Sequence, residues 1–303
     1  MGRVVVEAAE ALIDQKIPVL DKGFVRMVDY LGGDARIVQS ARVSYGAGTK
    51  TIREDRGLIQ YLYRNQHTSP FEQVQLSFHV KLPIFVARQW VRHRTARLNE
   101  VSGRYSIMPD EFYVPDTDRI RYQSDDNKQG SGAPMPFDYA QGAVDSIDSE
   151  QRCVYQNYSL MVDAGVAREL ARINLPLSLY TEWYWQIDLN NLFHFLALRL
   201  DAHAQYEIRE YGIALGKCAK AVAPLAYEAF EEYTLKGARF GGSELKLLRD
   251  MLQSKGFEPD SDLSQLTKLP ERRRKEFAAK LWGGRNGADP EIKPVTREEQ
   301  QGS

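Results

Sequence analysis

The sequence predicts an α+β protein, with a mixed sheet flanked by long helices and a helical C-terminal extension. Residues 72–82, EQVQLSFHVKL, alternate apolar and polar side chains, as in a strand with one buried face. Residues 142–172 and 190–223 instead repeat apolar residues at helical spacing. The 303 residues are 43% hydrophobic, which is enough to build a sizeable core.

The elements of the first hundred residues follow from local patterns. Residues 23–32 predict a strand, and 34–46 predict a helix that ends at a glycine. A second helix is expected over 51–66. Pro83 suits the first position of a short helix that leads into residues 92–106, because its missing N–H has no partner there in any case.

The middle of the chain mixes a loop with long helices. Residues 121–139 are rich in Gly, Pro and Asp, which predicts a long loop, either a lid or an insertion that orders on binding. The helix over 142–172 follows, and the aromatic segment 181–187 predicts a strand. Residues 190–223 predict the longest helix of the chain.

The character of the sequence changes after about residue 240. Segments 243–256 and 269–284 have the pattern of two amphipathic helices, and a polar tail begins at Asn286. We therefore predict a main domain over 1–240 and a helical extension with a polar tail over 241–303.

Composition excludes several classes of protein. Lys and Arg number 40 against 41 Asp and Glu, so the chain has no overall field that would attract nucleic acid or an acidic membrane. No apolar run approaches the roughly 20 residues of a membrane span. Acidic residues interrupt the first 16 residues, where a signal peptide would be apolar. With two cysteines outside any disulfide framework, we expect a cytoplasmic protein without a membrane or nucleic-acid partner.

The chain has no pattern of a nucleophilic or metal-dependent enzyme. GxSxG, HExxH and CxxC are absent, and so are the GxGxxG and P-loop motifs. Cys153 and Cys218 stand in helical patterns and are interpreted as structural thiols. His203 and Glu207, four apart, suit a hydrogen bond better than half of a metal site. His79 falls on the polar side of the predicted strand 72–82, which is expected to face solvent.

Residues 92–106, RHRTARLNEVSGRYS, concentrate hydrogen-bonding groups in one short stretch. The side chains of Arg92, Arg94 and Arg104 can clamp phosphates or carboxylates bidentately, and Asn99 and Glu100 can recognise a base or ribose edge. A helical turn separates Gln89 from Arg92, so both can point the same way. The stretch fits an anionic nucleotide-like ligand, and a solvated basic loop is the alternative.

Four ordered segments resemble the flavin-dependent thymidylate synthase family. They are RHRTARLNEVSGRYS, HTSPFE (67–72), ELARINLPLSLYT (169–181) and LALRLDAHAQYEIR (196–209), and the similarity spans about residues 20–235. The resemblance implies an α+β homotetramer with active sites at subunit interfaces. It also implies synthesis of dTMP from dUMP without an enzyme cysteine nucleophile. The methylene would come from 5,10-methylenetetrahydrofolate, and the hydride from NADPH through FAD.

The resemblance assigns roles to individual residues. Arg199, beside the uracil, and His67, near flavin and folate, are the expected catalytic residues. The implied dUMP site is Gln89, Trp90, Val91, Arg92, Glu100, Val101, Ser102, Gly103, Arg104, Arg172 and Arg199. The implied FAD site is Ser69, Arg92, His93, Arg94, Glu100, Asp188, Leu189, Asn190 and His194. No metal is expected.

Structural alternatives stand beside these roles. Arg199 and His203 could form a polar pair on one helix, and His67 could cap a turn. The aromatic residues of segment 181–187 favour the core or an interface over stacking on flavin. On one continuous helix, Asn190 and His194 would point away from Arg199 and His203. We therefore hypothesise that each such helix serves two active sites, formed with neighbouring subunits.

Three residues depart from the family pattern. Arg97 stands where Ser is common, Gln73 where His follows PFE, and His194 where Asn often contacts FAD. Arg97 could add a phosphate contact, but we favour solvent. Two other functions remain open. One is a flavin-dependent methylation or hydroxymethylation of another pyrimidine nucleotide, and the other is a non-catalytic nucleotide- or RNA-binding module.

Overall fold

The computed structural model describes residues 4–43, 52–125, 128, 130–258 and 269–283. The chain forms two compact units, Met1–Gly237 and Ala238–Ser303. The first unit contains the sheet and every residue for which we expect a functional role. The domain assignment of 1–240 and 241–303 remains a prediction about how the chain folds.

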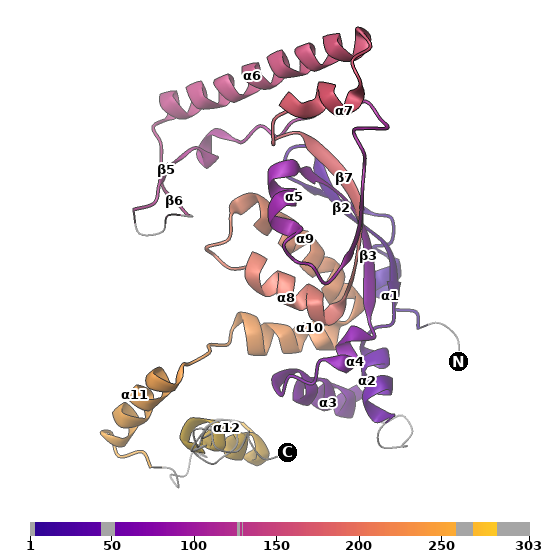
Figure 1. Ribbon diagram of the computed structural model, residues 1–303. Coiled ribbons are helices and arrows are strands. Elements are labelled where there is room, and N and C mark those ends of the chain that lie inside the picture. Colours follow the sequence, from indigo (N-terminus) through magenta and orange to yellow (C-terminus); the bar gives the residue numbers. More distant parts are fainter. Residues whose placement is uncertain (1–3, 44–51, 126–127, 129, 259–268, 284–303) are drawn as a thin grey trace, which may run out of the picture. The chain divides into compact units, whose positions relative to one another are not determined.

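A five-stranded sheet is the centre of the first unit (Figure 1), and its strand order is β1-β2-β3-β7-β4. The α+β class is confirmed. All the pairings in this sheet are antiparallel, whereas we expected a mixed sheet, and the parallel contact nearby is an isolated bridge between Ile13 and Met27. The strands are Lys16–Val19 (β1), Gly23–Leu31 (β2), Gln75–Pro83 (β3), Tyr180–Asp188 (β7) and Arg97–Glu100 (β4).

The central strand β3 separates a buried face from a polar one. Leu76, Phe78, Val80 and Leu82 are 0% exposed, whereas the residues between them are partly exposed. This is the alternation that the sequence of residues 72–82 predicts. Pro83 ends the strand and precedes the next helix as its N-cap, one position before the place expected for it.

Helices α5 (Ile84–Trp90), α8 (Leu189–Arg199) and α9 (Tyr206–Val222) cover the apolar face of the sheet (Figure 1). Trp90 is fully buried there, and its ring lies 5.5 Å from that of Trp183 and 5.1 Å from that of Trp185. The preference for a core position of the aromatic residues in 181–187 therefore holds for both tryptophans, while Tyr184 is 52% exposed on the opposite face.

The prediction of one helix over 190–223 is wrong, because the chain leaves the helix after Arg199 and re-enters it at Tyr206. The Asp201 carboxylate accepts a hydrogen bond from the backbone N–H of His203 at 2.8 Å. Its backbone carbonyl accepts one from the N–H of Ala204 at 3.0 Å. An Asp side chain that bonds nearby backbone in this way competes with the helical hydrogen bonds.

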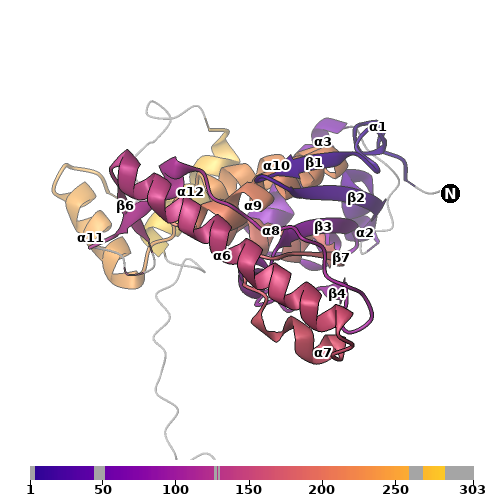
Figure 2. The same cartoon turned by 90° about the horizontal axis from the view of Figure 1, so that it is seen from above.

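The helices of the segment between β4 and β7 lie above one end of the sheet in Figure 1, and α6 crosses in front when the molecule is seen from above (Figure 2). Residues 121–139, predicted as a loop, instead contain a hairpin and the first turn of a helix. The helix expected over 142–172 ends at Asp163, before Gly165 with φ +84°, and resumes as a short turn. The elements are η1 (Thr117–Arg119), β5 (Arg121–Gln123), β6 (Ser131–Pro134), α6 (Phe137–Asp163), α7 (Arg168–Ala171) and η2 (Arg172–Asn174).

The remaining helices of this unit flank the start of the chain and the other end of the sheet. They are α1 (Glu7–Glu10), α2 (Asp34–Arg42), α3 (Ile52–Arg64), α4 (Ser69–Glu72), α10 (Pro224–Phe230) and the π-helical η3 (Glu231–Leu235). The expected end of α2 at residue 46 lies outside the described residues. Asp34 accepts hydrogen bonds from the N–H groups of Leu225 and Ala226, which ties α2 to the start of α10.

The second unit contains α11 (Gly242–Gln253) and α12 (Glu271–Gly283), as the sequence predicts. Arg249 Nε donates to the backbone oxygen of Leu281 and so joins the two helices. The polar tail from Asn286 lies outside the described residues. Across the helices that are described, none combines the length and the apolar character needed to cross a membrane.

Candidate functional site

The last residue of α8, Arg199, reaches His93 in the RHR segment that follows α5. Its Nε and one terminal nitrogen lie 3.2 and 3.1 Å from His93 Nε2, and the guanidinium can only donate. The Nε2 atom therefore accepts, and the ring proton of the neutral imidazole must be on Nδ1. The structural alternative, a polar pair of Arg199 with His203, is not formed, because His203 Nδ1 instead lies 2.8 Å from Asp201.

The surroundings of His93 keep its imidazole neutral. Burial lowers the pKa of His93 to about 4, and the positive charge of Arg199 and the nearby His194 add to the effect. The His93 ring lies 4.7 Å from that of Phe195 and 6.0 Å from that of His194. A neutral acceptor can hold the guanidinium in place without neutralising its charge.

The Arg199 side chain is suited to stabilising an anion. Burial lowers the pKa of its guanidinium, but an arginine stays protonated at neutral pH even so. The hydrogen bonds to His93 leave several of its five N–H donors for a ligand. A partly desolvated and oriented cation of this kind interacts strongly with negative charge that develops on a bound molecule.

A second contact joins α5 to the segment before α9. Gln89 Nε2 donates to Gln205 Oε1, and Gln205 Nε2 donates to the Glu207 carboxylate at 2.8 Å. The sequence analysis missed Gln205 and Glu207 as functional candidates. The only signal was the segment LALRLDAHAQYEIR, in which neither residue received a role. Glu207 bonds Gln205 and Tyr113, so its expected pairing with His203 is also wrong.

The expected phosphate-binding residues Gly103 and Arg172 lie side by side, just after β4 in the sequence and in η2. A Cβ atom added to Gly103 would lie 3.1 Å from Arg172 Cδ, so backbone and arginine are in close contact. Arg104 forms an exposed ion pair with Glu169, at 3.2 Å. Glu100 accepts a hydrogen bond from the buried Thr181 hydroxyl at 2.7 Å, which fixes its carboxylate against β7.

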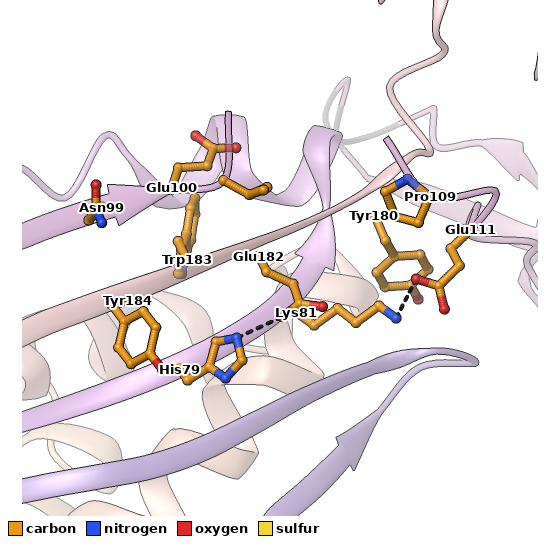
Figure 3. Close-up of a pocket in the computed structure, with 11 residues that line it drawn as sticks. His79, Lys81, Asn99, Glu100, Pro109, Glu111, Tyr180, Glu182, Trp183 and Tyr184 are labelled. Atoms are coloured by element: carbon orange, nitrogen blue, oxygen red, sulfur yellow. Dashed lines mark hydrogen bonds and ion pairs between the residues drawn. The ribbon is translucent and has the colours of Figure 1, made fainter. Parts of the chain in front are cut away.

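A cavity of about 440 Å³ opens on the polar face of the sheet (Figure 3). Glu100 and Val101 line it, but Arg199 and His93 do not, so it includes only part of the expected site. His79, expected to face solvent, lies in its wall. It is 2.7 Å from Glu182 and stacks on Tyr184 at 4.9 Å between ring centroids.

Most of the residues expected to hold FAD belong to two segments, residues 92–94 after α5 and residues 188–194 at the start of α8. Arg92 and Arg94 are exposed, and within the part of the chain that the structure describes neither has a hydrogen bond or ion pair. Asp188 caps α8 by accepting from the N–H of Asn191, which fixes the backbone at the start of the helix. The Leu189 side chain is 0% exposed, so only its backbone is available, and Asn190 follows it.

Some expected residues lie apart from these clusters. His67 is exposed, and its ring lies 5.9 Å from that of Tyr61; no contact among the described residues joins it to Arg199. Ser69 begins α4, which packs against α8. The buried Trp90 side chain leaves only its backbone for a ligand. Val91, the C-cap of α5, and Ser102 are half-buried, and the described residues hold no cluster suited to a metal ion.

The structure also locates two of the departures from the family pattern. Arg97 lies on β4, and its guanidinium is 3.4 Å from the amide oxygen of Gln186. It therefore has a protein neighbour, although it is exposed as expected. Gln73 is an exposed residue at the end of α4.

Comparison with known proteins gives consistent matches over most of the chain. The family model described as thymidylate synthase complementing protein matches residues 26–225. A flavin-dependent thymidylate synthase of Treponema denticola is 60% identical over 80% of this chain and 92% of its own length. The enzyme of the same name from Treponema pallidum is 52% identical over 94% of this chain and 90% of that protein.

Solved structures give the same picture. A UMP/dUMP methylase from Streptomyces cacaoi, bound with 5-Br dUMP, is 33% identical with a TM-score of 0.65. The match covers 72% of this chain and 98% of that one.

Proposed function

The chain belongs to the thymidylate synthase complementing protein family, and on this premise we propose that it makes dTMP from dUMP. The methylene group would come from 5,10-methylenetetrahydrofolate and the reducing hydride from NADPH through FAD. Support comes from the curated relatives, which carry the name flavin-dependent thymidylate synthase at up to 60% identity.

The observation that carries the proposal is the Arg199 guanidinium fixed on the neutral His93. Conversion of uracil to thymine requires C5 of the ring to attack a carbon electrophile, and negative charge develops on the base as the ring is polarised for that attack. Arg199 beside the base would stabilise that charge, because it is oriented before the reaction and stays protonated throughout. In this role His93 acts as a support that accepts hydrogen bonds.

The phosphate end of dUMP would bind Ser102, Gly103, Arg104 and Arg172. Arg104 and Arg172 are cations, Ser102 supplies a hydroxyl, and the absence of a Cβ at Gly103 lets backbone approach closely. Glu100, held by Thr181, would accept from a ribose hydroxyl. Gln89 and Arg92 would complete the nucleotide site, with the backbone of residues 90, 91 and 101.

The residues assigned to FAD have suitable chemistry for it. The exposed guanidinium groups of Arg92 and Arg94 fit a pyrophosphate, and the capped start of α8 offers polar backbone beside Asn190 and His194. When bound, the flavin supplies hydride transfer, which no side chain of the protein can perform. The contribution of the chain is to bind and orient the reactants and to exclude water. Ser69 and His67 would border this site.

A cysteine nucleophile has no place in this mechanism. Burial raises the pKa of Cys218 to about 12, so that thiol is protonated at neutral pH. Cys153 is exposed on α6, where its nearest polar partner is Asn157 of the same helix. Free thiols also suit a cytoplasmic location.

We further propose a homotetramer with active sites at subunit interfaces.

The test is a reconstitution with the purified protein. Flavin absorbance should be present, and dTMP should form from dUMP only when methylenetetrahydrofolate and NADPH are both added. Omission of either one should stop the reaction. A protein that binds dUMP but yields no dTMP with all components would contradict the proposal. A protein without flavin that binds RNA through residues 92–106 would favour the binding module instead.

A second candidate is methylation of UMP. The observation that favours it is the likeness to a methylase whose name includes both UMP and dUMP. Parallel reactions with UMP and dUMP at equal concentration decide between the two. A higher kcat/KM for UMP would make the ribonucleotide the substrate.

A further inference from the structure

A chain of hydrogen bonds leads from a buried carboxylate to a residue of the proposed nucleotide site. Glu207 is 9% exposed at the start of α9. Its carboxylate accepts from the Tyr113 hydroxyl at 3.1 Å and from Gln205 Nε2 at 2.8 Å. The other end of the Gln205 amide, Oε1, accepts from Gln89 Nε2. These hydrogen bonds thus join residues from three parts of the sequence, around positions 89, 113 and 205–207.

The Glu207 carboxylate determines which group donates in each of these hydrogen bonds. Burial and the neighbouring Glu207 raise the pKa of Tyr113, so its hydroxyl stays protonated and donates. A carboxylate only accepts, so the Gln205 amide must turn its nitrogen toward Glu207 and its oxygen toward Gln89. Gln89 must in turn donate. A glutamine amide without such a constraint can present either end.

We propose that Glu207 is a positioning residue that, through Gln205, fixes the Gln89 amide with its oxygen toward the bound nucleotide. This inference rests on the proposed dUMP site. One N–H and the carbonyl oxygen of Gln89 then remain for the ligand, and the oxygen requires a hydrogen-bond donor. Two groups of the dUMP nucleoside can donate such a hydrogen bond, the N3–H of the base and the 3′-hydroxyl of the sugar.

A variant without the acceptor tests the proposal. Glu207→Met keeps the length of the side chain but releases Gln205, and with it Gln89. The Kd for dUMP should rise about fivefold, the usual effect of one lost hydrogen bond. The kcat at saturating dUMP should stay within about twofold, because Arg199 and His93 are unchanged. A fall in kcat with an unchanged Kd would overturn the proposal.

A second variant separates positioning from folding. Gln205 is exposed, so Gln205→Leu interrupts the chain of hydrogen bonds without opening the core. It should raise the Kd by the same factor, and the double variant should add nothing more. Additive effects would mean that Glu207 does not act through Gln205. If Glu207→Met fails to fold, Gln205→Leu alone carries the test, and an unchanged Kd would refute the role.

Two nucleotide analogues identify the donor. N3-methyl dUMP lacks the base donor, and the 3′-deoxy analogue of dUMP lacks the sugar donor. The analogue without the group that Gln89 recognises should bind wild type and Glu207→Met equally well. If both analogues weaken fivefold in the variant, as dUMP does, the orientation of Gln89 is not what Glu207 controls.

A matched control is Gln151→Leu. Gln151 is 4% exposed and donates to the backbone oxygen of Tyr113 and to Ser178, so its loss disturbs the same buried region. It should reduce thermal stability but leave the Kd for dUMP unchanged. An equal rise in Kd in this variant would assign the effect to general disruption. Failure of wild type to bind dUMP at all would instead overturn the proposed function.

Discussion

Arg199 donates two hydrogen bonds to a single atom, Nε2 of His93, across 106 positions of the sequence. The pairing fixes the state of both side chains. The histidine obtains a donor that fixes its tautomer, and the arginine obtains an acceptor that leaves its charge intact. Since both residues belong to segments that resemble one enzyme family, the pair is the first target for mutation.

We expect Arg199→Ala to lower the kcat for dTMP formation about 10²–10³-fold, the typical cost of one lost charge-stabilising donor. Bound FAD and thermal stability should be largely retained, and steady-state kinetics with flavin absorbance measure both. Arg199→Lys should also be slow, because an ammonium cannot bond His93 and the base with the planar fork of a guanidinium. Arg152→Ala, an exposed change on α6, is the control. Near-normal turnover of Arg199→Ala would remove Arg199 from the mechanism.

The neutral state of His93 predicts how stability depends on pH. Its pKa is about 4 in the folded protein, below the ordinary value of 6.5. Between these values the unfolded chain binds one more proton at this site, so the free energy of unfolding rises with pH. Wild type should lose stability as the pH falls from about 6.5 to 4, and His93→Gln should lose less. Urea titrations at several pH values measure the difference.

The same experiment on Arg199→Ala checks the cause. Burial is the largest contribution to the lowered pKa of His93, and the charge of Arg199 is the next. Removal of the guanidinium should therefore raise the pKa of His93 in the folded protein and narrow the pH range over which stability depends on this residue. Identical pH dependence in wild type and His93→Gln would mean that His93 is not kept neutral by the fold.

We expect Cys153→Ser combined with Cys218→Ala to retain dTMP synthesis within about tenfold, because neither thiol takes part in the proposed chemistry. The alanine at 218 avoids burying a hydroxyl in the core, where Cys218 is 0% exposed. Product formation over time is the measurement. Lost activity in a variant that still folds and binds FAD would indicate an essential thiolate.

Gly103 should be sensitive to substitution for a local reason. A Cβ there would lie 2.9 Å from Met108 Sδ and 3.1 Å from Arg172 Cδ, so Gly103→Ala must displace Met108 and push the arginine by a few tenths of an ångström. The KM for dUMP should rise about tenfold, the effect of one weakened charged hydrogen bond. Gly142→Ala is the matched control, since nothing lies within 4 Å of its added Cβ on α6. It should stabilise the protein by about 0.5–1 kcal/mol with KM unchanged.

The sequence predicts best where one residue pattern has one structural cause. The alternation from Val74 to Leu82 follows directly from one buried face, and β3 is observed there. The helix break after Arg199 has a different cause. Its determinant is the Asp201 carboxylate, which bonds the backbone two residues on, and the apolar periodicity continues through it. Neither Pro nor Gly marks the place.

The site residues, too, can be predicted where a local sequence pattern marks them, and not where only tertiary contacts do. Residues 92–106 stand out because their donors are concentrated in one segment. Gln205 and Glu207 act through partners at positions 89 and 113, far away in sequence. Their role depends on tertiary contacts that no local pattern encodes. Asn190, His194 and Arg199 do lie on one continuous helix, α8, and the break after Arg199 separates only His203 from them. His93 nevertheless contacts both His194 and Arg199, so opposite sides of the helix can reach one neighbour in the same subunit.

That correction changes the design of a subunit-sharing test. His194 and Arg199 both lie against His93 of the same chain, so mixing variants of these two residues is uninformative. The expected dUMP residues still form two groups. One is Gln89 on α5 with Arg199 at the end of α8, and the other is Ser102, Gly103, Arg104 and Arg172. Among the described residues, no hydrogen bond or ion pair joins one group to the other.

We expect one nucleotide that uses both groups to be bound between two subunits of the proposed homotetramer. We expect Arg104→Ala and Arg199→Ala to be inactive alone and to form mixed oligomers when co-expressed with different affinity tags. With random mixing, about a quarter of the sites would combine an intact Arg104 with an intact Arg199, each from a different subunit. Doubly purified oligomers should then regain activity up to about that fraction. Mixed oligomers that form, bind FAD and remain inactive would mean that each subunit builds its own complete dUMP site.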